Sequence, residues 1–357
     1  MLPYRTGGDP LGVHRVLAPV GVLPQAADRL DTSLPLWSSE ILLDVHVLNI
    51  DAASFEQLHA TGWPVADQIE AIVRDRGKMQ NPVTGSGGML LGQIAEVGPD
   101  YTGPLAGLAV GTHVATLVSL TLTPLVLDEI TAIRPHAHQV EVRGRAILPS
   151  SAPAAALPAD LPPTLALAVL DVCGAPALCQ RLAGRLPAGG TVAILGAGKA
   201  GTLSAAALRQ CRPDLKLLLL DRFSAPAQQV LALGLVDEIA VLDCADALAV
   251  RAVVHDFAAR FGALTGSFGG CDAVIGTTSL PGAEMATVLA CKPRGVCLFF
   301  GMATQFAKVA LGAEGVGADV DLLIGNGYAQ GHADYALSLV RDTPGLRDLL
   351  ARRLAGV

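Results

Sequence analysis

The chain lacks the features that mark several large classes of protein. Its 25 Lys and Arg residues are outnumbered by 32 Asp and Glu residues, so it has no excess of positive charge with which to bind nucleic acid or an anionic membrane. Only 16% of its 357 residues are charged and 51% are hydrophobic, which excludes a disordered chain and indicates large buried cores. Proline, glycine or charged residues interrupt every apolar segment before it reaches the roughly 20 residues that span a membrane. We therefore expect two domains that bind neither nucleic acid nor membrane.

Cysteine is absent before residue 173, and no two cysteines form a C-x-x-C pair. The number of cysteines is odd, whereas a secreted domain built on disulfides needs an even framework. The first ten residues contain no apolar core of a signal peptide. The sequence therefore predicts a reduced, cytoplasmic protein whose cysteines pack as small apolar side chains.

The most informative feature that is present is a glycine-rich turn. An apolar run of β type, 191–195, leads directly into Gly196-Ala197-Gly198-Lys199-Ala200-Gly201 and then into a helical pattern. Gly196 permits a tight turn, Gly198 lets the backbone approach a pyrophosphate, and Gly201 lets the helix pack close to the strand. The N–H groups at the start of this helix, at Lys199 and Ala200, would face the phosphates. The turn predicts a dinucleotide-binding site.

An acid at the end of the next apolar run indicates which dinucleotide is bound. The run 216–220 ends in Asp221, 20 residues after Gly201. A carboxylate there accepts hydrogen bonds from the ribose hydroxyls of NAD and repels the phosphate of NADP, although Arg222 follows it. Thr277, directly after an expected strand, completes the predicted cofactor-binding set. The sequence therefore predicts NAD, and a glycine-rich turn in some other α/β unit is the alternative.

The pattern of expected secondary structure changes near the middle of the chain. After residue 190, strands alternate with helices, which predicts a doubly wound parallel sheet of the Rossmann type. The expected strands are 191–196, 216–221, 238–243, 272–276, 295–300 and 319–324, and the expected helices are 199–210, 225–233, 246–261 and 282–291. The first half reads as β-rich, with strands at 40–49, 90–97 and 111–120 and a helical segment at 54–75. An Ala- and Pro-rich connection follows at 150–163, then a helix at 164–182 that Gly-Ala-Pro interrupts at 174–176, and the chain has a helical tail at 332–354. We expect a β-rich domain of residues 1–158 and 330–357, and an NAD-binding domain of residues 159–329.

This order of domains resembles the medium-chain dehydrogenase/reductase superfamily, which combines a GroES-like catalytic domain with a Rossmann domain. Several long and unusual segments carry a more specific likeness: 22–25, 48–51, 77–88 (GKMQNPVTGSGG), 115–120, 302–304, 310–317 (ALGAEGVG), 324–328 (IGNGY) and 331–332. They closely resemble the L-erythro-3,5-diaminohexanoate dehydrogenase family of lysine fermentation. The resemblance implies NAD-linked oxidative deamination of 3,5-diaminohexanoate, or a close β-amino acid, to 5-amino-3-oxohexanoate and ammonia. It also implies a homo-oligomer, either a dimer or a tetramer.

The resemblance to the superfamily does not extend to its zinc site. Zinc-dependent members carry a cysteine just after an early strand and a Gly-His-Glu segment, where this chain has 48–51 (LNID) and 84–89 (TGSGGM). Cys173 falls near the position of the last zinc ligand, but one thiolate does not make a zinc site. The sequence therefore predicts that no metal is bound.

The implied reaction requires a base, because hydride leaves C3 only when the attached amine is neutral. Asp51 is the first candidate, since it follows an apolar strand at a place expected to face the nicotinamide. A helix N-cap would explain an aspartate there equally well. Asp171, a lone acid within an expected apolar helix at 165–172, is the second candidate, and it would either bind a substrate ammonium or form half of a structural ion pair. Asn49 is expected to be a positioning hydrogen-bond donor.

Further polar residues are candidates for contact with the substrate. Lys78 adjoins the glycine-rich loop and would bind the substrate carboxylate, with Asn81, Thr84 and Ser86 as neutral donors; a solvated charge cluster is the alternative. Ser119 ends an expected strand and would line the pocket, unless it reflects β-propensity alone. Glu129, in a loop-like segment, would bind an ammonium group or be simply a solvated acid.

Two other functions are compatible with the same fold. A zinc-free quinone or enoyl reductase would generally use NADPH, which Asp221 opposes. A non-catalytic binding protein would keep the glycines and lose the polar pocket, and the polar segments are present here. The sequence favours the dehydrogenase.

Overall fold

The computed structural model describes residues 4–117, 119–262, 269–278, 280–301 and 304–356. Val118, Met302 and Ala303, which belong to the family-like segments, lie outside the described residues. The chain divides into two compact units, the first Met1–Asp171 with Ala351–Val357 and the second Val172–Leu350. These units begin and end at other residues than the predicted domains, whose boundaries at 158/159 and 329/330 stay a prediction.

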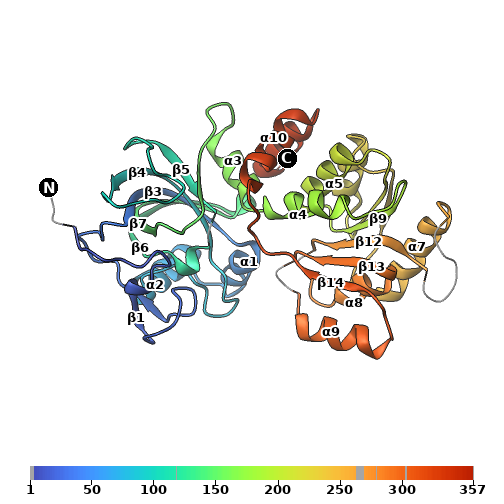
Figure 1. The fold of residues 1–357 in the computed structure, drawn as a ribbon, viewed down its shortest axis with the longest axis horizontal. Helices are drawn as coiled ribbons and strands as arrows, with labels where there is room; N and C mark the ends of the chain where they lie inside the picture. The colour runs from blue at the N-terminus through green and yellow to red at the C-terminus, as the bar shows by residue number, and fades with distance from the viewer. Residues whose placement is uncertain (1–3, 118, 263–268, 279, 302–303, 357) are drawn as a thin grey trace. The chain divides into compact units, whose positions relative to one another are not determined.

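The second unit is built on a parallel sheet (Figure 1). Its strands are β9 (Thr191–Leu195), β10 (Lys216–Asp221), β11 (Glu238–Val241), β12 (Cys271–Gly276), β13 (Cys291–Phe299) and β14 (Asp321–Ile324). They pair in the order β11-β10-β9-β12-β13-β14, and each pair is parallel. All five residues of β9 are buried, as expected for a strand that is covered on both faces. In this order the direction of winding reverses between β9 and β12, and ligands bind at such a point.

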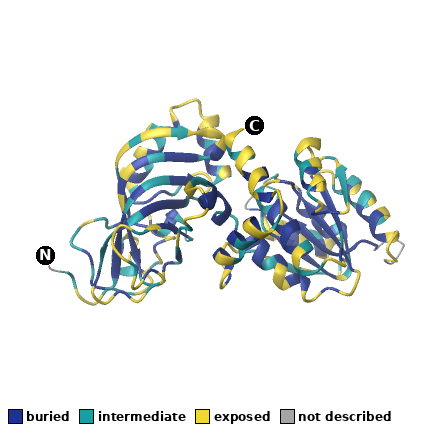
Figure 2. Cartoon of the chain, turned by 90° about the horizontal axis from the view of Figure 1, so that it is seen from above, coloured by how far each residue is buried: buried dark blue, intermediate teal, exposed yellow. Residues whose placement is uncertain are grey.

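Helices cover both faces of this sheet. On one side lie α4 (Gly174–Ala183), α5 (Lys199–Cys211) and α10 (His332–Asp342), and on the other lie α7 (Ala247–Ala259), α8 (Glu284–Leu289) and α9 (Phe306–Gly315) (Figure 1). Helix α6 (Ser224–Ala232) packs on β10 and β11, and α11 (Leu346–Ala355) ends the chain. Figure 2 shows the strands as buried and the outer sides of the helices as exposed. The doubly wound parallel sheet that the sequence predicts is confirmed.

The first unit contains an antiparallel sheet. Its strands are β3 (Glu40–Ile50), β4 (Gly88–Val97), β5 (His113–Thr116), β6 (Leu125–Arg134), β7 (Gln139–Pro149) and β8 (Ala154–Ala156), in the order β6-β7-β3-β4-β5-β8. The described part of this unit also contains a small strand pair, β1 (Val16–Ala18) with β2 (Arg29–Leu30), and the helices α1 (Ala52–Ala60), α2 (Val65–Arg76) and α3 (Pro163–Leu170). Short 3-10 turns lie at 13–15, 120–122 and 135–137. The central strand β3 is almost wholly buried between β4 and β7.

A buried ion network ties the segment before β3 to the sheet. The side chains of Arg15 and Glu40 are at most 1% exposed. Arg15 Nε donates to Glu40 Oε1 at 2.8 Å, and His14 Nε2 lies 2.7 Å from the same oxygen. Burial by itself raises the pKa of Glu40, but the hydrogen bonds from Arg15 and His14 outweigh it, so that the pKa is lowered. Glu40 is therefore held as a buried carboxylate.

Several expected elements differ from the observed ones. The expected helix 164–182 is interrupted, but at 171–173 rather than at 174–176, so that it forms two helices, α3 and α4. Pro176, which lacks the N–H that a helix interior needs, is accommodated in the first turn of α4. The expected tail helix is also two, α10 and α11, and Gly345 between them has a φ of 74°. The expected strand 111–120 shortens to β5. Strands β6, β7 and β8 and helix α9 were not expected.

The described part of the chain contains no single helix that is long and apolar enough to cross a membrane, and one bent pair, α3 with α4, meets that test by length and composition together. All seven cysteines are free thiols, and six of them are buried. Burial raises the pKa of the Cys179 thiol to about 12. These cysteines pack as apolar side chains, as predicted.

Candidate active site

The glycine-rich turn joins β9 to α5 in the second unit. Gly196 has a φ of 106°, a backbone conformation that side chains rarely allow. A Cβ atom at Gly201 would lie 1.8 Å from the carbonyl oxygen of Gly196, so only glycine lets the helix start this close to the strand. A Cβ atom at Gly198 would meet nothing within 4 Å, so the space beside its backbone is open. The N-cap residue of α5, Gly198, makes no side-chain capping bond, and the N-terminus of a helix favours an anion.

Two polar side chains brace this turn. Asp221, the last residue of β10, accepts a hydrogen bond from Ala197 N at 2.7 Å through Oδ2 and from Phe223 N at 2.8 Å through Oδ1. Thr277, directly after β12, donates through Oγ1 to the carbonyls of Leu195 and Gly196, at 2.9 and 3.1 Å. The ends of β9, β10 and β12 therefore meet at the reversal point of the sheet.

These residues fit a nicotinamide dinucleotide. Each carboxylate oxygen of Asp221 accepts one backbone hydrogen bond and retains a lone pair for a ribose hydroxyl. Lys199 and Ala200 lie half-exposed in the first turn of α5. Arg222 is exposed, and its guanidinium lies 5.0 Å from the ring centre of Phe223. The predicted cofactor residues therefore gather around one turn of the second unit.

In the first unit, Asp51 lies between the end of β3 and the start of α1. Its Oδ1 accepts hydrogen bonds from Ala53 N at 3.0 Å and from Ser54 N at 3.4 Å, so Asp51 is the N-cap of α1. Its own N–H faces the carbonyl of Gly87 at 3.3 Å. Within the described residues, no donor is bonded to Oδ2 of Asp51. The capping role is thus present, and the second carboxylate oxygen stays available to a ligand.

Three hydroxyl groups cluster beside this helix start. Ser54 Oγ lies 2.5 Å from both Thr84 Oγ1 and Ser86 Oγ, and the latter two lie 3.1 Å apart. Ser54 is buried, Ser86 is half-buried and Thr84 is exposed, so the cluster leads from the interior to the surface. Ser86 was predicted as a site residue. Ser54 was missed, because in the sequence it reads only as part of the helix.

Asn81 shapes the loop that carries these hydroxyls. It is fully buried; its Oδ1 accepts from Val83 N at 2.8 Å, and its Nδ2 donates to Gln57 Oε1 at 2.8 Å. Its amide is therefore used within the protein, and the predicted contact of Asn81 with the substrate has no support in this geometry.

A pair of amide side chains, Asn49 and Gln139, lies where β3 and β7 pair. Both residues are fully buried and stand opposite each other in the register of the two strands. Gln139 Nε2 donates to Asn49 Oδ1 at 3.3 Å and to the carbonyl of Thr164 at 3.2 Å. Asn49 Nδ2 and Gln139 Oε1 are buried with no hydrogen-bond partner among the described residues. Asn49 was a predicted site residue, whereas Gln139 was not, since only the pairing of strands brings it there.

Lys78 does not lie where the sequence suggested. It is fully buried, and its Nζ donates to the carbonyls of Pro24 at 2.8 Å and Gln25 at 3.1 Å. Burial, and to a smaller extent the charge of Arg76, lowers the pKa of Lys78 to about 8. Lys78 therefore anchors the segment before β2, and this position is incompatible with the expected contact with a substrate carboxylate.

The remaining candidates are dispersed over the first unit. Glu129 lies in strand β6, not in a loop, and its exposed carboxylate pairs with Arg143 of β7. Ser119 caps a short 3-10 turn by accepting from Thr121 N at 3.3 Å. Asp171 is the half-exposed C-cap residue of α3 and not part of the helix itself. The bond of Ser119 thus stabilises its own 3-10 turn, and the ion pair of Glu129 links β6 to β7. Neither interaction involves the hydroxyl cluster or the pair of Asn49 and Gln139.

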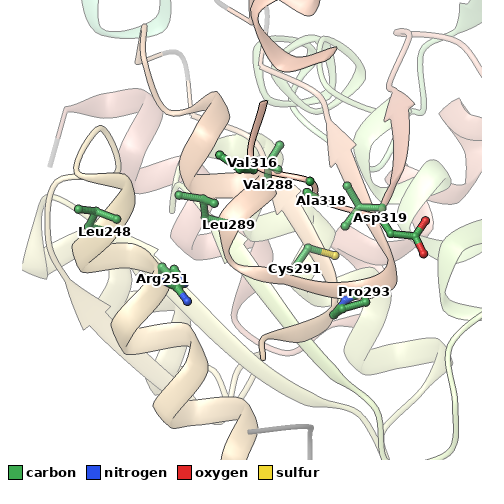
Figure 3. A pocket seen from close by; sticks show the side chains of 11 residues that line it. Leu248, Arg251, Val288, Leu289, Cys291, Pro293, Val316, Ala318 and Asp319 are labelled. Atoms are coloured by element: carbon green, nitrogen blue, oxygen red, sulfur yellow. The ribbon is translucent and has the colours of Figure 1, made fainter. Parts of the chain in front are cut away.

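A metal site requires several ligating side chains that lie close together. Within the described ranges, no group of three or more His, Cys, Asp or Glu side chains is placed to hold a metal ion. A cavity of about 470 Å³ lies at the amino-terminal ends of β13 and β14, the edge of the sheet opposite to the glycine-rich turn (Figure 3). Apolar side chains such as Val288, Leu289 and Ala318 form most of its wall, and it contains none of the predicted site residues.

Comparisons with known proteins point to the same family as the sequence segments named above. Residues 14–158 match the family model described as the L-erythro-3,5-diaminohexanoate dehydrogenase N-terminal domain. An L-erythro-3,5-diaminohexanoate dehydrogenase of Acetoanaerobium sticklandii is 43% identical over 342 residues, 94% of this chain and 96% of the relative. One of Fusobacterium nucleatum is 42% identical over 348 residues, 96% of this chain and 97% of the relative.

A solved alcohol dehydrogenase from Thermotoga maritima resembles the chain with a TM-score of 0.54 at 13% identity, covering 90% of this chain and 85% of that one. That likeness shows the fold, which is the medium-chain dehydrogenase/reductase architecture that the sequence predicts. The identity to the two relatives over nearly the whole length shows more than the fold. The chain belongs to the L-erythro-3,5-diaminohexanoate dehydrogenase family.

Proposed function

We propose that this chain catalyses the NAD-dependent oxidative deamination of L-erythro-3,5-diaminohexanoate to 5-amino-3-oxohexanoate and ammonia, a step of lysine degradation. The observation that carries the proposal is the 43% identity, over 94% of the chain, to a relative of that name. The braced glycine turn with Asp221 supports it independently, because the turn suits a dinucleotide and the carboxylate favours NAD over NADP.

The cofactor would be held by the second unit. The backbone around Gly198 and the N-terminus of α5 would bind the pyrophosphate, and Asp221 would bind the ribose hydroxyls. When bound, NAD supplies a nicotinamide ring that accepts a hydride from C3 of the substrate. Thr277 would keep the turn in shape through its bonds to the carbonyls of Leu195 and Gly196.

The substrate chemistry would be the task of the first unit. Asp51 accepts the proton that the C3 ammonium must lose, through the oxygen Oδ2 that the helix cap leaves available. A carboxylate is a weaker base than an amine, so we expect activity to rise towards alkaline pH, where more of the substrate amine is already neutral. The hydroxyls of Ser54, Thr84 and Ser86 would accept hydrogen bonds from an ammonium group of the substrate. Asp171 remains the second candidate for the base or for an ammonium contact.

We also propose that the enzyme acts in the cytoplasm as a homo-oligomer, a dimer or a tetramer, on a small-molecule substrate only. The excess of acidic residues supports the absence of nucleic-acid and membrane partners. Size-exclusion chromatography with light scattering measures the oligomeric state directly.

The test of the function is a panel of β-amino acids that includes 3,5-diaminohexanoate, with NAD reduction followed by absorbance and ammonia measured in parallel. We expect equal amounts of NADH and ammonia from 3,5-diaminohexanoate. NADPH-dependent reduction of quinones or enoyl compounds, without any amine oxidation, would contradict the proposal and favour the reductase alternative.

A further inference from the structure

The amide pair of Asn49 and Gln139 has a fixed orientation. Gln139 Nε2 points to the carbonyl of Thr164, which can only accept a hydrogen bond, so this end of the side chain must be the NH2 group. The same Nε2 also faces Asn49, whose Oδ1 must therefore be the acceptor. The two groups left over are a donor, Asn49 Nδ2, and an acceptor, Gln139 Oε1.

An unpaired donor and an unpaired acceptor in a fully buried position are unfavourable, and proteins tend to keep such groups for a ligand or a water. The backbone holds the pair in place from both sides. His138, which precedes Gln139, has a φ of 54°, uncommon for a residue with a side chain, and its carbonyl accepts from Ile50 N at 2.9 Å. The start of β7 is thereby fixed against the end of β3.

The chemistry of the two free groups selects their ligand. An ammonium group can only donate, so it would leave Asn49 Nδ2 unpaired, and a carboxylate can only accept, so it would leave Gln139 Oε1 unpaired. Water donates and accepts, and it is small enough for a fully buried position. Asn49 lies in β3 and Asp51 follows the last residue of that strand, a spacing of two that side-chain alternation along a strand places on one face.

We propose that Asn49 Nδ2 and Gln139 Oε1 hold the water that hydrolyses the imine product of amine oxidation. This inference rests on the proposed function, in which loss of a hydride from C3 leaves an iminium carbon. Asn49 Nδ2 donates a hydrogen bond to the water oxygen, Gln139 Oε1 accepts a hydrogen bond from the water, and a lone pair of the water oxygen remains directed at C3. Holding the water in this way supplies orientation, which neither a solvated carboxylate nor a hydroxyl alone provides.

The step balances without any further reactant. Asp51 first releases to solvent the proton that it took from the substrate ammonium. The water oxygen then forms a bond to C3 while the C=N π electrons move to nitrogen, and a water proton passes to the Asp51 carboxylate. That proton is returned to the nitrogen, and the C3–N bond breaks to release ammonia. The hydroxyl proton passes to the Asp51 carboxylate as the C=O bond forms, and from there to ammonia. Iminium plus water gives ketone plus ammonium, with no change of oxidation state.

The experiment separates hydride transfer from hydrolysis in the full-length enzyme with NAD and 3,5-diaminohexanoate. Rapid mixing follows NADH, and samples quenched with sodium borodeuteride are analysed by mass spectrometry, because this reagent converts the imine to an amine with deuterium at C3 and the ketone to an alcohol. In Asn49→Leu and Gln139→Met, we expect an NADH burst within about twofold of the native rate. Steady-state ammonia formation should fall roughly 10²-fold and the deuterated amine should accumulate.

Gln68→Met is the matched control, because Gln68 Nε2 also donates to two carbonyls, those of Leu58 and Trp63, both at 3.0 Å, but Gln68 lies in helix α2 and neither of these bonds involves the amide pair. It should leave both phases unchanged. If the two apolar variants fail to fold by circular dichroism, Asn49→Asp and Gln139→Glu keep shape and polarity and are measured in the same way.

Variants in which the NADH burst and ammonia formation fall together, with no deuterated amine, would overturn the inference and leave the pair a purely structural contact. Variants that match the native enzyme in both phases would also overturn it. A native enzyme that forms no NADH contradicts the proposed function itself, and the inference then falls with it.

Discussion

Asp51 has two proposed roles, since its side chain caps helix α1 and its charge would act as the base. Two substitutions can separate these roles. Asparagine is as good an N-cap as aspartate, so Asp51→Asn preserves the bonds from Ala53 N and Ser54 N and removes only the charge. Asp51→Ala removes both. We expect both variants to lose roughly 10²–10⁴-fold in kcat, about 3–5 kcal/mol of transition-state stabilisation, while NAD affinity stays near native.

Stability should separate the same two variants. Asp51→Ala is expected to lower the free energy of unfolding by about 0.5–2 kcal/mol through the lost cap. Asp51→Asn is expected to lose only the interaction of the charge with the helix dipole, about 0.3–1 kcal/mol. Urea unfolding followed by circular dichroism measures both, and steady-state kinetics at several pH values measures kcat.

An Asp51→Asn variant with native kcat would refute the assignment of the base. If Asp171→Asn were then inactive, the base would be Asp171. If both variants were active, the proposed position of the substrate in the first unit would be wrong. A loss of activity only in Asp51→Ala, in proportion to its loss of stability, would show that Asp51 serves the fold alone.

Three further predictions concern the cofactor turn, the metal content and the buried lysine. NAD should bind at least ~10-fold more tightly than NADP. Asp221→Ser should reduce this difference in affinity by removing about 1–3 kcal/mol of repulsion towards NADP, and it should weaken NAD binding because the bond to Ala197 N is lost. Calorimetry measures the affinities of the native protein and the variant for both cofactors, and equal native affinities would refute the reasoning. Elemental analysis should find no stoichiometric zinc and chelators should leave activity intact, whereas one zinc per chain would contradict this. The pKa of Lys78 is about 8 in the folded protein and returns to its ordinary value of 10.5 in the unfolded chain, so the unfolded chain binds more protons between these pH values. The contribution of Lys78 to the free energy of unfolding should therefore increase as pH rises from 8 to 10.5. Urea unfolding across this window should show a smaller increase in Lys78→Met, and an identical pH dependence in the variant would contradict the prediction.

The parallel sheet could be predicted because its signals are local. Each strand is a short apolar run, and the turn at Gly196 has a pattern that physical chemistry explains residue by residue. Helix α9 was missed because Gly312 and Gly315 lower its apparent helix propensity. Strand β6 was missed because most of its residues are at least partly exposed, so it has no clear apolar face.

The candidate site was predictable only where it is local. Asp51 could be found because it directly follows a strand and precedes a helix. Gln139 could not, since its partner Asn49 is 90 positions away and only strand register brings the two together. Lys78 was misplaced for a related reason: lysine is rarely buried, and the carbonyls that bind it are 53 and 54 positions away.

The buried network of Arg15 and Glu40 limits how this family of sequences can change. Removing Arg15 leaves the buried Glu40 carboxylate with His14 and Trp37 N as its partners. Removing Glu40 leaves the buried Arg15 guanidinium with Asp31 and the carbonyl of Ser33. Breaking a buried ion pair in this way costs about 3–5 kcal/mol, comparable to much of the stability of an ordinary domain. Replacing both with apolar residues of similar size can be nearly neutral. Arg15 and Glu40 are therefore difficult to replace one at a time in evolution, because the intermediate with a single substitution is less stable than either the charged or the apolar pair. This holds although the charged pair itself adds little to stability. An engineer who wishes to alter the segment before β3 should therefore change both positions in one step.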